Sequence, residues 1–285
     1  MSARYSNGFG RFEPMPRPVL VGIVNITEDS FSDGGRFLDP AAAIVHARRL
    51  VAGGADIVEF GAAASNIAAK PVAAAEEIRR LEPVIAALQA DRIALAIDTY
   101  RPEVQHFAID RGIDYLNDIH GFPDPAIYGE LAGARCRLVV MHSVQQDGRA
   151  QRVDLAADEV WRRIEDLFGE RVSRLEQAGV ARERLILDPG MGFFLSSRPE
   201  ASLSVLAHFG RLKRRFGLPI MVSVSRKSFL GAITRRQQSS ELGAATLAAE
   251  LYAAEHGVNF IRTHDPVALR DALAVTEALA TVGRG

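Results

Sequence analysis

Residues 19–29 read Val-Leu-Val-Gly-Ile-Val-Asn-Ile-Thr-Glu-Asp, and the choice between two α/β architectures turns on them. The run is apolar up to Asn25, which is typical of a strand buried on both faces. An open doubly wound sheet that binds a dinucleotide would carry a glycine-rich GxGxxG turn directly after such a strand. A polar segment follows instead, so the stretch favours a closed barrel with polar residues at its strand ends.

Seven further apolar runs follow along the chain. Together with the first they predict strands over 19–25, 56–60, 93–98, 115–117, 138–141, 185–188, 220–223 and 259–262. Segments with apolar residues at helical spacing lie between them, at 40–53, 74–90, 102–111, 155–179, 200–216 and 242–257. This alternation predicts an α/β fold of the (β/α)8 TIM-barrel class, with the open doubly wound sheet as the alternative.

The size and charge of the chain fit one globular enzyme domain. Its 285 residues suit a single barrel over 18–285, after a loosely ordered tail over 1–17. Lys plus Arg (34) nearly balance Asp plus Glu (35), so no overall field favours nucleic acid or a membrane surface. The chain shows neither a membrane-length apolar run nor a secretory signal at its start, so we expect a cytoplasmic protein. The lone Cys136 is interpreted as core packing.

Nearly every predicted strand ends at a polar residue. In a barrel the carboxyl ends of the strands build the active site, so these residues are expected to share one mouth. Turn formation or helix capping could explain each one separately, as for Asp98 before the next helix. The polar residues at the strand ends are Asn25, Asp98, Asn117, Asp118, His142, Asp188, Ser225, Arg226, Lys227, Ser228, Arg262, Thr263 and His264.

The mouth is expected to have two chemically different halves. The loops after strands seven and eight, where barrels often bind phosphate, carry Arg226, Lys227, Arg262 and His264. These donors suit a polyphosphate group. The acidic and amide residues of strands three, four and six suit the amino and imino edge of a flat heterocycle. The long polar segment after the first strand, with its aromatic residue and two glycines, is interpreted as a lid.

At this point the residues resemble a known family, dihydropteroate synthase, over about residues 19–279. The matching motifs come in the family's order: residues 22–35, then Ile97-Asp98-Thr99-Tyr100, Leu116-Asn117-Asp118, Met141-His142, Leu187-Asp188-Pro189-Gly190, Ser225-Arg226-Lys227-Ser228 and Arg262-Thr263-His264. The resemblance implies condensation of p-aminobenzoate with 6-hydroxymethyl-7,8-dihydropterin diphosphate, giving 7,8-dihydropteroate and pyrophosphate in folate synthesis. It also implies Mg2+ as the cofactor, those two small molecules as partners, and a homodimer.

Carried over position by position, the resemblance implies a role for each site residue. The pterin would be bound by Asp98, Asn117, Asp188 and Lys227. Pyrophosphate would be held by Asn25, Arg262 and His264, with Asn25 also the Mg2+ ligand. The p-aminobenzoate would be enclosed by Phe31, Ser65, Phe193, Phe194 and Ser228. Asp98, Lys227 and Asp33 would take part in catalysis, Asp98 by stabilising a pterin cation.

Two departures from the family pattern resemble its Sul-type, sulfonamide-insensitive branch. A Thr-Arg pair usual after the second strand is replaced by Ser65-Asn66, which removes a cation from the p-aminobenzoate side. The loop after the sixth strand is about two residues longer than usual and carries both Phe193 and Phe194. An aromatic at the rim could exclude a bulkier sulfonamide and spare the substrate. Packing in the barrel is the alternative role of both rings.

Two other functions remain open from the sequence. A pterin-binding methyltransferase domain shares the barrel and the pterin-reading carboxylates, and it would act with a corrinoid partner. The basic residues of strands seven and eight favour a pyrophosphate leaving group instead. A catalytically silent pterin or drug binder is the third possibility, which turnover would exclude.

Overall fold

The computed structural model describes residues 17–27, 39–62, 72–145 and 152–282. The expected tail lies outside this part of the chain except for Arg17, whose guanidinium donates to both carboxylate oxygens of Asp56 at 2.8 and 2.7 Å. Asp56 in turn accepts the backbone N–H of Leu20 at 2.8 Å. The start of the first strand is thereby tied to the start of the second.

Eight parallel strands form a closed barrel. They are β1 (Val19–Asn25), β2 (Ile57–Gly61), β3 (Leu95–Asp98), β4 (Tyr115–Asp118), β5 (Arg137–Met141), β6 (Leu185–Asp188), β7 (Met221–Val222) and β8 (Phe260–Thr263). Their order is β6-β5-β4-β3-β2-β1-β8-β7, and a bridge between Leu187 and Ile220 joins the two outermost strands. The predicted TIM barrel is confirmed, and the open doubly wound sheet is wrong.

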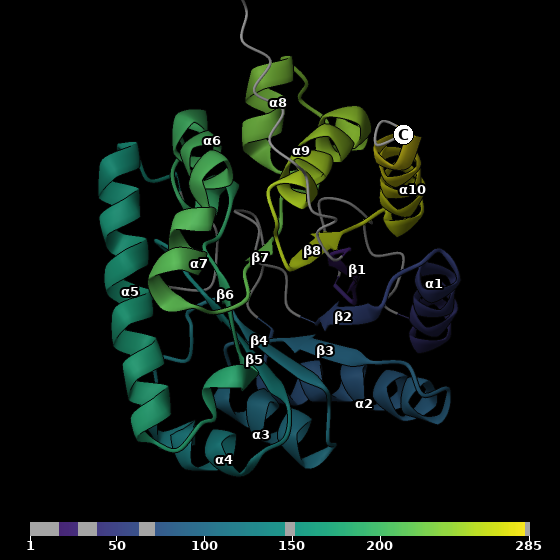
Figure 1. The fold of residues 1–285 in the computed structure, drawn as a ribbon. Coiled ribbons are helices and arrows are strands. Elements are labelled where there is room, and N and C mark those ends of the chain that lie inside the picture. The colour runs from purple at the N-terminus through teal and green to yellow at the C-terminus, as the bar shows by residue number, and fades with distance from the viewer. Residues whose placement is uncertain (1–16, 28–38, 63–71, 146–151, 283–285) are drawn as a thin grey trace, which may run out of the picture.

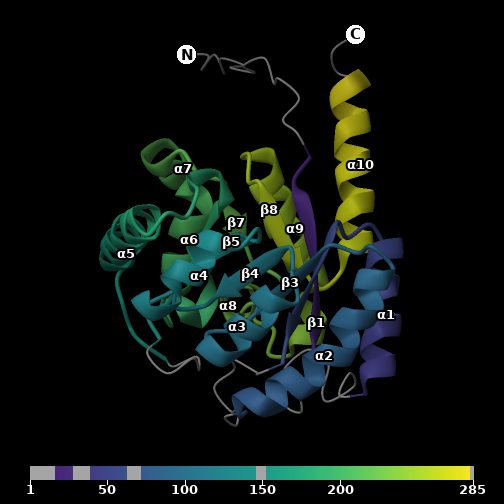
Figure 2. The same ribbon diagram turned by 90° about the horizontal axis from the view of Figure 1, so that it is seen from below.

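A ring of helices surrounds the strands, with α5 and α1 on opposite sides in Figure 1. The α-helices of the described chain are α1 (Pro40–Ala52), α2 (Ala74–Ala90), α3 (Pro102–Asp110), α4 (Tyr128–Gly133), α5 (Ala157–Gln177), α6 (Pro199–His208), α7 (Gly210–Phe216), α8 (Ser228–Thr234), α9 (Gly243–Glu255) and α10 (Pro266–Val282). Short 3-10 turns lie at Pro125–Ile127, Arg182–Arg184, Gly192–Phe194 and Ser239–Leu242. Figure 2 shows α10 running alongside β1. None of the described helices has the length and apolar character needed to span a lipid bilayer.

One of the predicted helices is interrupted in the structure. The predicted helix over 200–216 is two helices, α6 and α7, interrupted at Phe209. Glycine, the residue that follows as Gly210, has the lowest helix propensity after proline, so a break costs least there. The ring of Phe209 is fully buried and belongs to the core between the strands and the helices.

Two apolar regions hold the barrel together. The larger lies between the strands and the helices, and it includes the buried Cys136 that the sequence assigned to the core. The smaller fills the inside of the barrel with one residue from most strands: Val21, Ile57, Ala96, Val139, Ile186, Met221 and Phe260. Because side chains alternate along a strand, the residues two positions further on face the same interior. That next layer forms the floor of the barrel mouth.

Candidate active site

The layer of side chains above the smaller apolar region, inside the barrel, is largely polar. Two positions beyond Ile57, Ala96, Ile186 and Phe260 stand Glu59, Asp98, Asp188 and Arg262. Asn117, paired in register with Asp98, completes the set on β4. The interior of the barrel therefore changes from hydrocarbon to carboxylate, amide and guanidinium within one layer, at the carboxyl ends of the strands.

Arg262 binds two carboxylates across the barrel. Its Nε donates to Oε1 of Glu59, and its Nη2 donates to Oδ2 of Asp98 at 3.1 Å. The other oxygen of Glu59 accepts from Nδ2 of Asn117 at 3.2 Å. Glu59 is completely buried, whereas about a quarter of the Asp98 side chain (24%) remains exposed at the mouth. The network thus links β2, β3, β4 and β8 and leaves Asp98 accessible to a ligand.

Burial and charge shift the pKa values of these groups. Burial, followed by the charge of Glu59, raises the pKa of Asp98 to about 7, although Arg262 and Lys227 oppose the shift. Burial, followed by the charge of Arg262, lowers the pKa of Lys227 to about 8. Burial would also lower the pKa of Arg262, but Glu59 and Asp98 outweigh it and raise that pKa. At neutral pH the mouth holds the ammonium of Lys227 and the guanidinium of Arg262 beside Asp98, a carboxylate that is easily protonated.

Asp188 has both a turn role and a place in the mouth. Its Oδ1 accepts the backbone N–H of Gly190 at 2.7 Å, as an Asp at a turn does. Burial nevertheless raises its pKa to about 6, while that hydrogen bond and the charge of Lys227 partly oppose the shift. A purely local turn role therefore does not explain the whole environment of Asp188. By contrast, Asp98 caps no helix, since the residue preceding α3 is Arg101.

Asp118, the next residue after Asn117, serves the scaffold. It accepts from Nε2 of Gln105 on α3 and from the backbone N–H of His120, both at 2.8 Å. Burial raises its pKa to about 6. His142 after β5 is equally buried and neutral, because burial lowers its pKa to about 4. Both polar strand ends support the loops around the mouth.

The basic side of the mouth comes from β8 and the loop after β7. Nδ1 of His264 lies 2.9 Å from Oγ of Ser225, which also accepts the His264 backbone N–H at 3.2 Å. Burial, with the positive charges of Arg226 and Arg262, holds the pKa of His264 well below its usual value. Because Ser225 Oγ already accepts the backbone N–H, we assign its hydroxyl proton to the bond with Nδ1 and the proton of the neutral ring to Nε2, a donor that suits an anion.

One buried acceptor in the mouth lacks a partner. Oδ1 of Asn117 is buried and makes no hydrogen bond within the described part of the chain, whereas Nδ2 of the same amide binds Glu59. An unsatisfied buried acceptor costs free energy unless a ligand or water supplies a donor. Asn117 therefore keeps an unused acceptor next to the polar network of Glu59, Arg262 and Asp98.

The two phenylalanines of the loop after β6 have different surroundings. Phe194 is buried beside Met141 and Ile119, and Nζ of Lys227 lies 4.7 Å from its ring centroid. Phe193 is half-buried. Cζ of Arg152 lies 5.7 Å from the Phe193 ring centroid.

The loop also packs against the start of α8. A methyl group built on Gly192 would come 3.2 Å from Oγ of Ser228, so the loop backbone and this half-buried serine are in close contact. Asn25 is half-buried at the end of β1, in register with Gly61. The three remaining predicted site residues, Phe31, Asp33 and Ser65, lie outside the described residues.

Glu59 is the site residue that sequence reasoning missed. The prediction considered the residue that closes each strand, and Glu59 stands two positions before the end of β2. The available signal was a charged residue in the middle of the apolar run Ile57-Val58-Glu59-Phe60, because a buried charge needs a partner. The partner is Arg262, 203 positions further along the chain.

Within the described residues no group of three His, Cys, Asp or Glu side chains could hold a metal ion. Mg2+ commonly keeps several waters and binds substrate phosphates with only one or two protein ligands. The neutral amide of Asn25, near the basic side of the mouth, fits that mode of binding.

Comparison with known proteins agrees with this chemistry. A family model described as pterin binding enzyme matches residues 21–264. Dihydropteroate synthase type-2 of Escherichia coli is 55% identical over 93% of this chain and 97% of its own. Another Escherichia coli relative, dihydropteroate synthase without a type number, is 34% identical over 93% of this chain and 92% of its own. The solved Xanthomonas albilineans dihydropteroate synthase with 4-aminobenzoic acid is 36% identical, with a TM-score of 0.82 over 92% of this chain and 93% of that one.

Proposed function

The chain belongs to the dihydropteroate synthase family of pterin-binding enzymes, and from that premise we propose that it joins p-aminobenzoate to 6-hydroxymethyl-7,8-dihydropterin diphosphate. The amine nitrogen bonds to the methylene carbon of the pterin while the carbon–oxygen bond to pyrophosphate breaks. The amine gives up one proton, and the products are 7,8-dihydropteroate and pyrophosphate. The polar layer inside the barrel is the observation that carries the proposal.

The acidic and amide residues suit the pterin ring. A pterin presents ring N–H and amino donors along one edge, and Asp98, Asp188 and the unpartnered Oδ1 of Asn117 are acceptors. Bonding to such donors favours the charged carboxylates against the burial that raises their pKa values. The carboxylate of Asp98 would then stabilise positive charge that develops on the pterin as the leaving group departs.

The basic residues suit the departing pyrophosphate. Arg262 and the Nε2–H of His264 supply donors from β8 and the residue that follows it. Fixed donors at oxygens that gain charge lower the barrier electrostatically, so no covalent nucleophile is needed. The Asn25 amide oxygen would hold Mg2+, which would supply positive charge beside the pyrophosphate.

The test is a pyrophosphate-release assay with both substrates, with each substrate alone, and with a chelator. We expect pyrophosphate and dihydropteroate in equal amounts only when both substrates and Mg2+ are present. Lys227→Met should lower the rate of pyrophosphate release strongly, because the variant removes the ammonium that interacts with the carboxylates of Asp188 and Asp98. Lys213→Met, on the exposed surface of α7, is the matched control. Binding of a pterin without turnover would instead indicate a silent binder.

We further propose that this enzyme is a sulfonamide-insensitive form, and that Phe193 is the residue that excludes the drug. The greater identity to the type-2 relative than to the relative without a type number supports the first part. The difference in exposure between the rings of Phe193 and Phe194 supports the role of Phe193. Phe194 is buried under Lys227, whereas half-buried Phe193 follows Gly192, whose backbone packs on Ser228.

A pair of variants separates the two rings. Phe193→Gly should lower the inhibition constant for a sulfonamide while the KM for p-aminobenzoate changes much less, because only the drug extends past the shared ring. Phe194→Leu is the control and should leave drug sensitivity unchanged. Unmodified protein that is inhibited as strongly as an ordinary family member would refute the insensitivity, and sensitivity restored only by Phe194→Leu would refute the role of Phe193.

We also propose a homodimer that uses the outer face of α10. Val275, Leu279 and Val282 are 59%, 67% and 80% exposed, and their i, i+4, i+7 spacing places them on one stripe. A second copy would bury this stripe. Light scattering should give twice the chain mass for the unmodified protein and one chain mass for Leu279→Glu, while Ile233→Glu on α8 stays dimeric. A monomeric unmodified protein would refute the proposal.

A further inference from the structure

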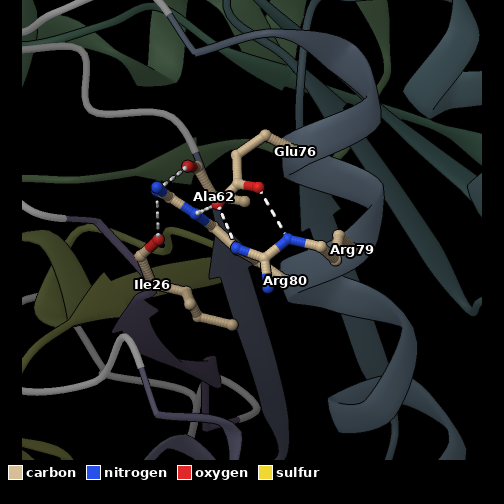
Figure 3. Close-up of polar contacts among 5 residues, drawn as sticks. All are labelled: Ile26, Ala62, Glu76, Arg79 and Arg80. Atoms are coloured by element: carbon tan, nitrogen blue, oxygen red, sulfur yellow. Dashed lines mark hydrogen bonds and ion pairs between the residues drawn. The ribbon is translucent and has the colours of Figure 1, made fainter.

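Arg80 on α2 binds the ends of two strands at once. Its Nη1 donates to the carbonyl oxygens of Ile26 and Ala62, at 3.3 and 3.4 Å, and its Nε donates to Oε1 of Glu76 at 2.7 Å (Figure 3). Only 8% of the Arg80 side chain is exposed. Burying a guanidinium is costly unless its donors are used, so these carbonyls are part of what holds it inside.

The neighbouring Arg79 shows that a helical ion pair does not require this burial. Arg79 binds both oxygens of the same Glu76, each at 2.7 Å, and 74% of its side chain is exposed. In Figure 3 the two arginines reach Glu76 from different directions, and only Arg80 extends to the strand ends. The contacts to Ile26 and Ala62 therefore distinguish Arg80 from an ordinary surface partner of Glu76.

The two carbonyls stand where the pairing of β1 and β2 ends. The register of the strands finishes at Asn25 opposite Gly61, and one more bond joins the Ile26 N–H to the Gly61 oxygen at 2.9 Å. The next carbonyls along each strand are those of Ile26 and Ala62. By donating to both, Arg80 fixes their spacing after the β-sheet pairing has stopped.

The same turn of α2 also reaches the end of β3. Glu77 pairs with Nε of Arg101 at 2.8 Å and accepts from Oγ1 of Thr99 at 3.2 Å. Glu77 is almost completely buried. One helical turn therefore holds three consecutive strand ends by side-chain contacts, and Arg80 makes those to the first two.

We propose that Arg80 is a positioning residue for p-aminobenzoate, because it fixes the carbonyls of Ile26 and Ala62, which come shortly before residues 28–38 and 63–71 in the sequence. These segments contain Phe31 and Ser65, for which the family resemblance implies p-aminobenzoate binding, and Asp33, for which it implies a part in catalysis. The inference rests on the proposed function. It requires no contact between Arg80 and the substrate.

The test compares Arg80→Met, Arg80→Lys and the control Arg79→Met. We expect Arg80→Met to raise the KM for p-aminobenzoate about tenfold or more, which corresponds to ~1.4 kcal/mol. The dissociation constant for 6-hydroxymethyl-7,8-dihydropterin should stay within about twofold, because its predicted ligands lie on β3, β4, β6 and the loop after β7 and are not held by Arg80. The pterin is used without its diphosphate, since Asn25 adjoins Ile26. Arg79→Met should have the KM for p-aminobenzoate of the unmodified protein. The KM of Arg80→Lys should lie between those of the unmodified protein and Arg80→Met.

An unchanged KM for p-aminobenzoate in Arg80→Met, or equal losses for both ligands, would overturn the proposal. If Arg80→Met does not fold, Arg80→Lys decides, since one ammonium cannot bridge both carbonyls and Glu76 as the planar fork does. Hydrogen exchange over residues 28–38 and 63–71 gives a readout without turnover and should be faster in the Arg80 variants than in Arg79→Met. Unmodified protein that makes no dihydropteroate would refute the proposed function. The exchange measurement needs no turnover, so its result tests the role of Arg80 separately.

Discussion

Replacing Glu59 by glutamine tests how the mouth is prepared for a pterin. Both partners of Glu59, Nε of Arg262 and Nδ2 of Asn117, are donors, and the side chain is fully buried. Glutamine offers one carbonyl oxygen and one NH2 group, so one donor would meet another donor. The least costly arrangement keeps the bond to Arg262 and rotates the Asn117 amide so that its Oδ1 meets the new NH2. Asn117 then presents a donor to the mouth where it now presents an acceptor.

The magnitude follows from those two changes. A pterin donor facing the rotated amide leaves a buried mismatch worth ~1–3 kcal/mol, which lowers kcat/KM for the pterin substrate roughly tenfold to a hundredfold. The bond to Arg262 changes from a charged to a neutral acceptor, which costs ~1 kcal/mol of stability because charged hydrogen bonds are about twice as strong. The melting temperature should fall by roughly 2–4 °C.

The pH dependence gives a second signature of Glu59→Gln. After burial, the charge of Glu59 is the largest cause that raises the pKa of Asp98 to about 7. Removing that charge lowers the pKa of Asp98, so the carboxylate persists to lower pH. The acid limb of kcat/KM should therefore move to lower pH even though the maximum falls.

The assay is the pH profile of kcat/KM for the pterin diphosphate, together with thermal melting. Glu165→Gln is the matched control: Glu165 is also buried and binds two arginines, Arg211 and Arg215, but lies on α5 outside the barrel. This control should lose stability and leave the pH profile unchanged. An acid limb of Glu59→Gln that coincides with that of the unmodified protein would refute the reasoning.

Three further outcomes are expected. For the unmodified enzyme, kcat/KM should fall below pH about 7 as Asp98 is protonated and above pH about 8 as Lys227 loses its proton. A pH profile with only one limb would contradict this. Gly190→Ala should melt several degrees lower than Gly112→Ala, because both glycines have positive φ but only at Gly190 does a Cβ overlap the backbone carbonyl that follows β5; equal melting temperatures would exclude the overlap. Burial raises the pKa of Glu250 to about 8 from 4.5, so its stabilising contribution is complete below about 4.5 and is lost as pH rises through 8. Glu250→Gln mimics the protonated form, so its melting temperature should fall less between pH about 4.5 and 8 than that of the unmodified protein. Equal falls in the two proteins would contradict this role of Glu250.

The sequence predicted the barrel well because its strands are buried on both faces. Such strands are continuous apolar runs, and the eight predicted ranges agree with the observed strands to within two residues. The short α8 and the break between α6 and α7 were not predicted, since tertiary packing decides elements of that length. The 3-10 turn over Gly192–Phe194 was not predicted for the same reason.

The mouth was predictable only where a polar residue closes a strand. Asp98, Asn117 and Arg262 were found in this way. They lie together, because Arg262 contacts Asp98 directly and is linked to Asn117 through Glu59. Glu59 itself is one layer deeper, and its partner lies on the last strand, so no local pattern reveals the pair. Likewise the sequence could not separate Phe193 from Phe194, because adjacent residues differ in exposure only once the loop is folded.

A crystal structure of the protein with dihydropteroate, pyrophosphate and Mg2+ tests the central claim most directly. We predict that the amino edge of the pterin meets Asp98, Asp188 and Oδ1 of Asn117, while the pyrophosphate lies on Arg262 and the Nε2–H of His264. A pterin bound elsewhere, or a pyrophosphate bound away from β8, would contradict the assignment of the barrel mouth.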